Sequence, residues 1–86
     1  MVVFKSEIRN APTQQIIKIF LNDESLDREV KDYLESFNEV EYVEIRKSVE
    51  RNRTSKNIAV YGHQGIDINA LKLKIDEGLI VYFDDK

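Results

Sequence analysis

Two segments of the chain carry apolar residues at helical spacing. The first begins after the polar run 22–25, in which Asp23 and Ser25 can accept a hydrogen bond from a free amide of a first helical turn. We expect this helix to end near Phe37. Its apolar stripe recurs every three or four residues among charged neighbours, as in a helix with one buried face. The stripe consists of Leu26, Val30, Leu34 and Phe37.

The second predicted helix begins at Asp67, which suits the capping position that precedes the first turn. Ile66 before the cap and Leu71 four residues after it form a hydrophobic staple. Leu71 and Ile75 continue the apolar stripe. Gly78 supplies a residue that readily adopts the left-handed conformation at a helix end, so we expect the helix to stop there.

Between and beyond the two helices, β-branched and aromatic residues alternate with polar ones, a period of two that predicts strands. The alternation is clearest after the first helix, where Val43, Ile45 and Val49 are separated by polar residues. A polar hairpin loop is expected over residues 51–55, and His63 to Gly65 form a further turn. Four strands are predicted: Gln15–Asn22, Glu41–Glu50, Asn57–Gly62 and Leu79–Phe83.

The first fifteen residues form an N-terminal extension, and residues 16–86 form a single domain. Val2 to Ile8 could form an additional strand, followed by a turn at Asn10 to Thr13 because Asn and Pro favour turns. The predicted order of the domain is therefore β-α-β-β-α-β. This is the order of a ferredoxin-like α+β sandwich, in which both helices cover one face of a four-stranded antiparallel sheet.

The alternation also assigns each strand residue to one face of that sheet. Toward the helices it places Ile17, Ile19, Leu21, Val43, Ile45, Ile58, Val60, Val81 and Phe83. On the opposite face it places four aromatic residues: Phe20, Tyr42, Tyr61 and Tyr82. A sheet face without a covering layer is normally polar, so these four rings are the leading candidates for a partner-binding surface.

The composition limits the function classes that the chain can serve. Its 86 residues are 42% hydrophobic and 34% charged, as in an ordinary small globular domain, and the net charge is −3. There is no cysteine, so disulfides, thiolate metal sites and cysteine nucleophiles are excluded. The longest apolar run, residues 16–21, is too short to span a membrane, and no leader opens the chain. We expect a cytoplasmic protein.

The core spacing resembles the heavy-metal-associated domain of copper chaperones and metal-transporting ATPases. In the first half, the resemblance rests on Val30, Leu34, Phe37, Val40, Val43 and Ile45. In the second half it rests on the run from Asp67 to Leu71, followed by Ile75 and the pair Gly78-Leu79. It covers residues 16–83 and implies the same ferredoxin-like fold.

The family holds copper with a Cys-x-x-Cys motif at the start of the first helix. In this chain those two positions fall on Asp23 and Leu26, neither of which is a soft ligand. The resemblance therefore implies a degenerate member without the metal site, and we expect no bound metal and no cofactor. A degenerate relative could still dock onto a transporter or a chaperone partner.

Other families with this topology match less of the chain. The Gly-rich loop of acylphosphatases is missing, and no glycine precedes the first helix as it does in amino-acid-binding regulatory domains. Ile19 to Asn22 fits the shorter signature of RNA-recognition motifs, whereas Lys56 to Tyr61 lacks the paired aromatics of the longer one.

No catalytic arrangement can be assembled from the sequence. The single histidine, His63, lies in a turn without an identifiable partner, so we expect the protein not to be an enzyme. The acidic side chains of Asp23, Glu24 and Asp27 could bind Ca²⁺, but acids at the start of a helix usually cap it and complement its dipole. We interpret them as capping residues.

The charges are unevenly distributed along the chain. Residues 23–44 hold nine acidic and two basic side chains, a balance of −7, whereas residues 46–56 hold five basic residues and one acidic, a balance of +4. The basic residues lie on the predicted hairpin, where RNA-recognition motifs contact phosphate. They form the candidate nucleic-acid-binding set: Arg46, Lys47, Arg51, Arg53 and Lys56.

The sequence thus leaves three uses for the aromatic face. It could bind a protein partner or a second copy of the chain, because tyrosine and phenylalanine are common in interfaces. The N-terminal segment could instead cover it, with Val2, Phe4 and Ile8 packed against the rings. It could also stack nucleic-acid bases. We favour a small non-enzymatic interaction or regulatory module, with nucleic-acid binding as the alternative.

Overall fold

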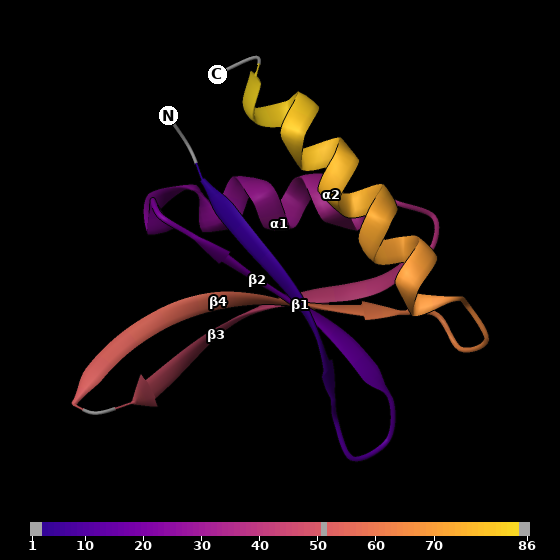
Figure 1. The fold of residues 1–86 in the computed structure, drawn as a ribbon, viewed down its shortest axis with the longest axis horizontal. Helices are drawn as coiled ribbons and strands as arrows, with labels where there is room; N and C mark the ends of the chain where they lie inside the picture. The colour runs from indigo at the N-terminus through magenta and orange to yellow at the C-terminus, as the bar shows by residue number, and fades with distance from the viewer. Residues whose placement is uncertain (1–2, 51, 85–86) are drawn as a thin grey trace.

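In the computed structural model, which describes residues 3–50 and 52–84, both helices lie on the same side of a four-stranded antiparallel sheet (Figure 1). The α+β class, the antiparallel sheet and the two helices agree with the sequence prediction. The elements in chain order are β1 (Phe4–Asn10), β2 (Gln15–Leu21), the 3-10 turn η1 (Glu24–Leu26), α1 (Asp27–Glu35), β3 (Val40–Glu50), β4 (Arg53–Gly62) and α2 (Ile68–Asp84).

The first helix forms where the sequence predicts it. Asp23 precedes the 3-10 turn, and its Oδ1 accepts a hydrogen bond from the backbone N–H of Ser25 over 3.1 Å. In α1, Val30 and Leu34 are fully buried against the sheet, and Phe37 packs beside them after the helix ends. The predicted stripe is therefore the face that α1 presents to the core.

The N-terminal strand is part of the sheet. β1 pairs with β2 along its whole length, from Phe4 opposite Leu21 to Asn10 opposite Gln15. The strand order is β1-β2-β4-β3, so β1 and β3 form the two edges. Residues 4–10 and the domain that follows them thus share one sheet, in agreement with the additional strand that the sequence allows.

The hairpin between β3 and β4 is longer than predicted. β4 begins at Arg53, so most of the expected loop over residues 51–55 is strand. Asn52 adopts a φ of 65°, a left-handed conformation that asparagine tolerates and that a tight turn requires. At the other end of β3, the register shifts between Val40 and Tyr42, which leaves Glu41 as a bulge.

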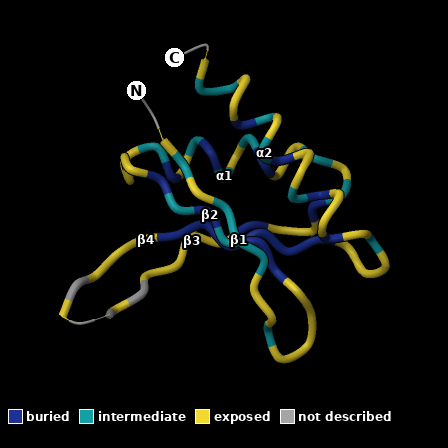
Figure 2. Tube along the Cα trace, in the orientation of Figure 1, coloured by how far each residue is buried: buried dark blue, intermediate teal, exposed yellow. Residues whose placement is uncertain are grey.

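The main core lies between the sheet and the helices, as the face assignment predicts for most strand residues. It includes Ile17, Ile19, Leu21, Val43, Ile58 and Val60. Ile45 also points to the helix side, as predicted, but it is 38% exposed and is not part of the core. The β3–β4 hairpin extends past the helices (Figure 1), and the described residues of its outer half are exposed (Figure 2).

The predicted closing strand Leu79–Phe83 is wrong, because these residues continue α2 to Asp84. Leu71, Ile75 and Leu79, each four residues apart, are all buried, so one helical stripe runs through the whole segment. The element order is therefore β-β-α-β-β-α. The sheet keeps four strands because β1 supplies an edge strand from the opposite end of the chain.

The expectation that Gly78 ends the second helix is wrong for the same reason. Gly78 lies inside α2. Because it has no side chain, there is room beside it for Tyr33 of α1 and for Phe37, which follows α1. Among the described residues, Gly65 is the glycine with a positive φ, at 89°, in the loop before α2. The cap at the start of α2 is confirmed, since Asp67 Oδ1 accepts hydrogen bonds from the backbone N–H groups of Asn69 and Ala70.

Candidate functional site

The side of the sheet that faces away from the helices is termed here the open face. The register places opposite one another, on adjacent strands, Glu7 and Lys18, Lys18 and Ala59, and Ala59 and Glu44. Alternation along each strand then gives the rest of the face. Its residues are Lys5, Glu7 and Arg9 on β1, Ile16, Lys18 and Phe20 on β2, Asn57, Ala59 and Tyr61 on β4, and Tyr42, Glu44 and Arg46 on β3.

Phe4 and Ile8 of the N-terminal segment do not cover this face. Phe4 and Ile8 pack into the core on the helix side, and the ring of Phe4 lies 6.0 Å from that of Phe83 in α2. The alternative in which the segment packs on the aromatic rings is therefore wrong for these two residues, while Val2 lies outside the described residues. The segment joins the sheet edge as β1, so its alternation turns its apolar side toward the helices.

A second, small core forms on the open face itself. Ile16, Ala59 and Tyr61 are buried there together, with Ala11 from the β1–β2 loop packed against them. The β1–β2 and β3–β4 hairpins cross at a large angle (Figure 1), and Ile16 of β2 packs against Ala59 and Tyr61 of β4. Tyr61 is consequently only 6% exposed, although it points to the predicted face. It can support a binding surface but offers little area to a partner.

Tyr42 is the exposed aromatic residue that this small core supports. It lies opposite Tyr61 on the neighbouring strand, and the two rings stack at 4.3 Å with an angle of 11° between their planes. Tyr42 remains 42% exposed, and Phe20 on β2 is half-buried. The structure thus brings Phe20, Tyr42 and Tyr61 to one face, with Tyr42 as its outermost ring.

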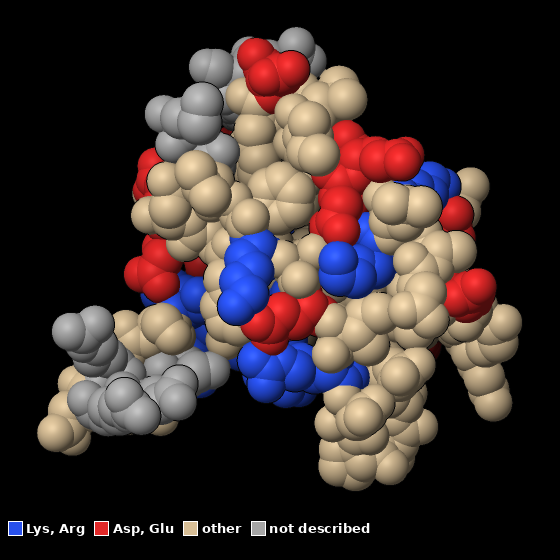
Figure 3. All heavy atoms as spheres, viewed as in Figure 1, with Lys and Arg blue, Asp and Glu red and all other residues tan. Residues whose placement is uncertain are grey.

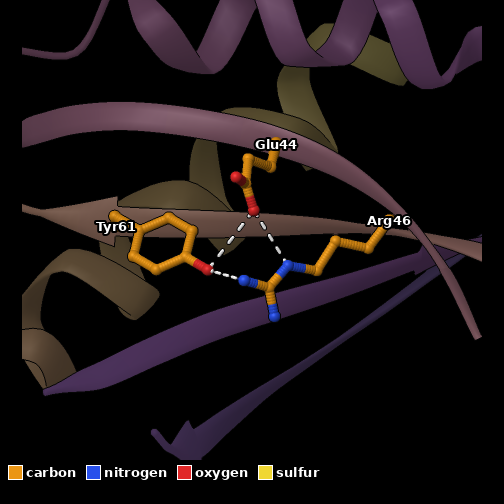
Figure 4. A network of polar contacts seen from close by, with 3 residues as sticks. All are labelled: Glu44, Arg46 and Tyr61. Atoms are coloured by element: carbon orange, nitrogen blue, oxygen red, sulfur yellow. Dashed lines mark hydrogen bonds and ion pairs between the residues drawn. The ribbon is translucent and has the colours of Figure 1, made fainter. Parts of the chain in front are cut away.

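A polar network fixes the position of Tyr61 (Figure 4). Arg46 donates from Nε to Glu44 Oε2 over 2.9 Å and from Nη2 to the Tyr61 hydroxyl, and that hydroxyl donates to Glu44 Oε2 over 3.4 Å. Burial raises the pKa of Tyr61 above its ordinary value of 10.0. The hydrogen bond with Glu44 raises the pKa of Arg46, so this guanidinium keeps its charge.

Sequence reasoning overlooked the role of Glu44 in this network. The signal was present, because Glu44 and Arg46 are two residues apart on a strand and therefore point to the same side. The pairing of Tyr42 with Tyr61, which places the hydroxyl near them, follows the regular register that begins at the β3–β4 turn, where Glu50 lies opposite Arg53. The loop predicted over residues 51–55 does not give this register. That register could not be determined from the sequence.

The fourth predicted aromatic residue, Tyr82, does not lie on the open face. Because residues 79–83 are helical, Tyr82 projects from α2 toward α1, where its ring stacks on Tyr33 at 4.6 Å. Its hydroxyl donates a hydrogen bond to Glu29 Oε2 over 2.7 Å. Tyr82 therefore stabilises the contact between the helices, and its predicted place on the sheet face with the other three rings is wrong.

Basic side chains outnumber acidic ones on the open face. Lys5 and Arg9 both form ion pairs with Glu7, and these contacts lower the pKa of Glu7. Lys18 lies at the centre of the face, next to Glu7 on β1. Among the open-face residues named above, Lys5, Arg9, Lys18 and Arg46 stand against Glu7 and Glu44, an excess of two positive charges.

The candidate nucleic-acid-binding residues do not gather on one face. Arg46 points to the open face, whereas Lys47 and Lys56, opposite each other on the hairpin, share the parity of Ile45 and Ile58 and point to the helix side. Arg51 lies outside the described residues, and so does the side chain of Arg53.

The structure also brings acidic groups beside the basic hairpin. Glu24 Oε2, at the start of the first helix, accepts a hydrogen bond from the backbone N–H of Lys56 over 2.7 Å. On the side of the molecule drawn in Figure 3, basic and acidic side chains lie next to one another. The contacts of Glu24 with Lys56 and of Glu44 with Arg46 join the acidic segment 23–44 to the basic segment 46–56.

His63 lies at a groove of about 560 Å³ between two loops. The groove is lined mainly by residues 13–15, where the β1–β2 loop enters β2, and by residues 62–66 before α2, together with Glu41. His63 is exposed, and within residues 3–50 and 52–84 no side chain is hydrogen-bonded to its ring. The arrangement does not identify a nucleophile or a base.

The positions that match the metal-binding motif have structural roles. Asp23 caps the 3-10 turn, and its hydrogen bonds with Ser25 lower its pKa. Leu26 packs against the main core. In the part of the chain that the structure describes, no three acidic or histidine side chains group to hold a metal ion, and neither helix is long and apolar enough to cross a membrane.

Comparison of the chain with family models, with curated protein sequences and with solved structures gives no match.

Proposed function

We propose that this domain is a non-enzymatic binding module that holds a protein partner on the open face of its sheet. The observation that carries the proposal is the stack of exposed Tyr42 on buried Tyr61, which Arg46 and Glu44 hold in place. A ring fixed in this way loses little conformational entropy on binding, which favours its use as an anchor. Tyrosine and arginine are also the residues that most often dominate the energy of protein interfaces.

The charge of the open face indicates the chemistry of the partner. Four basic and two acidic side chains surround the rings, so an acidic segment with an apolar or aromatic anchor would complement the face. Lys18 lies near the middle of the face, between β1 and β4, where an acidic side chain of the partner could reach it. Phe20 on the same strand supplies apolar contact area.

Nucleic-acid binding is the second candidate function, and the direct pairing of Lys47 with Lys56 favours it. Like charges opposite each other on neighbouring strands destabilise a sheet, and a bound phosphate would relieve this repulsion. The carboxylate of Glu24 accepts a hydrogen bond from the backbone N–H of Lys56 and adds a negative charge near this pair. Because Arg46 points to the other face, these residues support a protein partner better than a polyanion.

We also propose that the fold is a rearranged ferredoxin-like sandwich. The consecutive segment β2-α1-β3-β4-α2 keeps the order expected for that fold, and β1 stands at the edge beside β2 in place of a C-terminal strand. The proposed relation to heavy-metal-associated domains concerns this framework only. It would make the open face, and not the start of the first helix, the functional surface.

The proposed function can be tested with defined ligands. Peptides selected from a displayed random library on the immobilised domain should be enriched in acidic and aromatic residues. Their affinity for Tyr42→Ala and Lys18→Glu should fall by about tenfold or more, since an anchor and a charge contact are removed. Leu73→Ala, which changes an exposed residue on α2, is the matched control and should bind like the wild type.

A second titration separates the two candidate functions. Fluorescent single-stranded oligonucleotides are added to the domain at increasing salt concentration. If they bind tightly, with an affinity that falls steeply and linearly on a logarithmic salt scale, the nucleic-acid function replaces the protein-binding one. If the selected peptides bind Tyr42→Ala and Lys18→Glu as well as the wild type, the open face is not the binding surface.

A further inference from the structure

The outer edge of β3 is unpaired within the described part of the chain. β3 is the longest strand, with eleven residues, and it lies at one end of the order β1-β2-β4-β3. An edge strand presents a row of backbone N–H and C=O groups that can pair with another strand. A strand that pairs with this edge needs side chains complementary to those of β3.

The side chains of β3 are complementary to those of a second β3 in antiparallel pairing. When two copies of Val40–Glu50 overlap fully, Ile45 lies opposite Ile45 of the second copy. Glu44 then lies opposite Arg46 of the second copy, and the symmetry repeats this contact on the other side of Ile45. Opposite charges directly across two strands stabilise their pairing.

We propose that the chain forms a two-fold symmetric dimer by pairing β3 with β3 of a second copy. This inference goes beyond the binding function proposed above, because the backbone edge of β3 forms the contact. Glu44 and Arg46, which point to the open face, flank that contact. A two-fold axis at Ile45 satisfies the requirement that the same surface serve both copies. The result is one continuous antiparallel sheet with four strands from each copy.

The other edge of the sheet is unsuited to the same contact. Full antiparallel overlap of two β1 strands places Glu7 opposite Glu7 of the second copy. It also places Lys5 opposite Arg9 of the second copy, so each of these pairs is repulsive. The charge order therefore selects β3 over β1 for self-pairing and limits the assembly to two copies.

The exposure of Ile45 fits this interface. Ile45 has the parity of a core residue, yet 38% of it remains exposed because neither helix covers it. In the dimer, Ile45 would pack against Ile45 of the second copy across the axis, with Val43 nearby on the same side of the sheet. The bulge at Glu41 interrupts regular pairing near the start of β3, so the contact centres on residues 43–47.

The dimer can be tested by reversing single charges. Sedimentation velocity of the full chain over a range of concentrations should show a dimer for the wild type. Glu44→Arg faces Arg46 of the second copy with a like charge, and Arg46→Glu faces Glu44 with a like charge. Each should weaken dimerisation by about tenfold or more.

Mixing the two variants provides the decisive measurement. Glu44→Arg carries two positive charges on this stretch and Arg46→Glu carries two negative ones, so a mixed pair regains both attractive contacts. A heterodimer should form in the mixture although neither variant dimerises well alone. A merely structural role of the Glu44–Arg46 pair within one copy cannot produce this rescue.

Two further variants guard against unfolding and against a different interface. Ile45→Lys places two like charges at the axis on an already exposed residue, and it should also give monomers with an unchanged circular dichroism spectrum. Lys18→Glu alters the open face away from this edge and should leave the dimer intact. A monomeric wild type at the highest concentration reached, or no heterodimer on mixing, would overturn the proposal.

Discussion

Gly78 in α2 lies against the hydroxyl group of Tyr33 in α1. A Cβ atom on Gly78 would stand 2.7 Å from the Tyr33 hydroxyl oxygen, closer than real side chains approach. The ring of Tyr33 cannot easily move away, because it stacks on Tyr82 at 4.6 Å and meets Phe37 edge-on at 5.3 Å. The glycine inside α2 thus sets how closely the two helices pack.

Gly78→Ala should lower the stability of the domain. Alanine favours an isolated helix over glycine by about 1 kcal/mol, but overpacking at a close contact costs about 1–3 kcal/mol. We expect a net loss of about 1 kcal/mol in the free energy of unfolding, measured by chemical denaturation. The same substitution in a Tyr33→Phe background should cost less, since the hydroxyl is gone. An increase in stability for Gly78→Ala in the wild-type background would contradict this account.

A second prediction compares Leu79 with Val81. In a strand, residues two apart point to the same side, so both would be buried or both exposed. In α2, Leu79 is fully buried and Val81 is 64% exposed. Leu79→Ala should therefore destabilise by about 2–5 kcal/mol, whereas Val81→Ala should change the free energy of unfolding by about 0.5 kcal/mol or less. Similar losses for both variants would indicate a strand.

Residues 79–83 form a helix although the sequence predicts a strand, because local preference and tertiary contacts disagree there. The run from Leu79 to Phe83 contains β-branched and aromatic residues, and it follows a glycine, so local preference favours a helix stop and a strand. The tertiary contacts reverse both signals. Gly78 is required by the nearby Tyr33, and the edge that a closing strand would occupy is taken by β1.

The candidate surface was predictable in direction but not in exposure. Alternation along the strands correctly predicts that Phe20, Tyr42 and Tyr61 point away from the helices. It could not show that Tyr61 would be buried, because that depends on how flanking strands close over β4. Tyr82 does not lie on this face because residues 79–83 are helical, so the alternation of a strand does not apply to them. Sequence periodicity thus gives the side of a strand residue and leaves its depth to the tertiary structure.

A third prediction concerns Asp27 at the first position of α1. The residue is only 4% exposed, and among the described residues no donor reaches its Oδ2. Burial, together with the nearby acids Glu24 and Asp23, raises the pKa of Asp27 above its ordinary value of 3.8. Folding therefore favours the protonated carboxyl, and this contribution is lost as the pH rises from 3.8 through the pKa of the folded state.

Asp27→Asn should remove this pH dependence. Relative to the variant, the wild type should lose free energy of unfolding as the pH rises from below 3.8 to neutrality. Comparing the two proteins at each pH cancels the opposite trend from Glu7 and Glu39, whose pKa values are lowered by their lysine and arginine partners. Denaturant unfolding at several pH values gives the difference. A difference that is constant, or that grows in favour of the wild type, would contradict the assignment.

The last prediction concerns the hydroxyl of Tyr61 in the network with Arg46 and Glu44. Tyr61→Phe leaves the stacked ring in place but removes the hydrogen bonds of the hydroxyl group, so it should cost about 1 kcal/mol of stability. Since the pKa of Tyr61 is raised above 10.0, the stability tied to its neutral phenol is lost only as the pH rises beyond that value.

The ionisation of Tyr61 can be followed by the ultraviolet absorbance of phenolate during an alkaline titration. The chain has four tyrosines, and we expect a late step from Tyr61 that disappears in Tyr61→Phe. Tyr42→Phe removes a phenol from the same stack without touching the network, so the late step should persist. If Tyr61→Phe leaves the late step unchanged while Tyr42→Phe abolishes it, Tyr42 is the buried ring. The open face would then present Tyr61 to its partner.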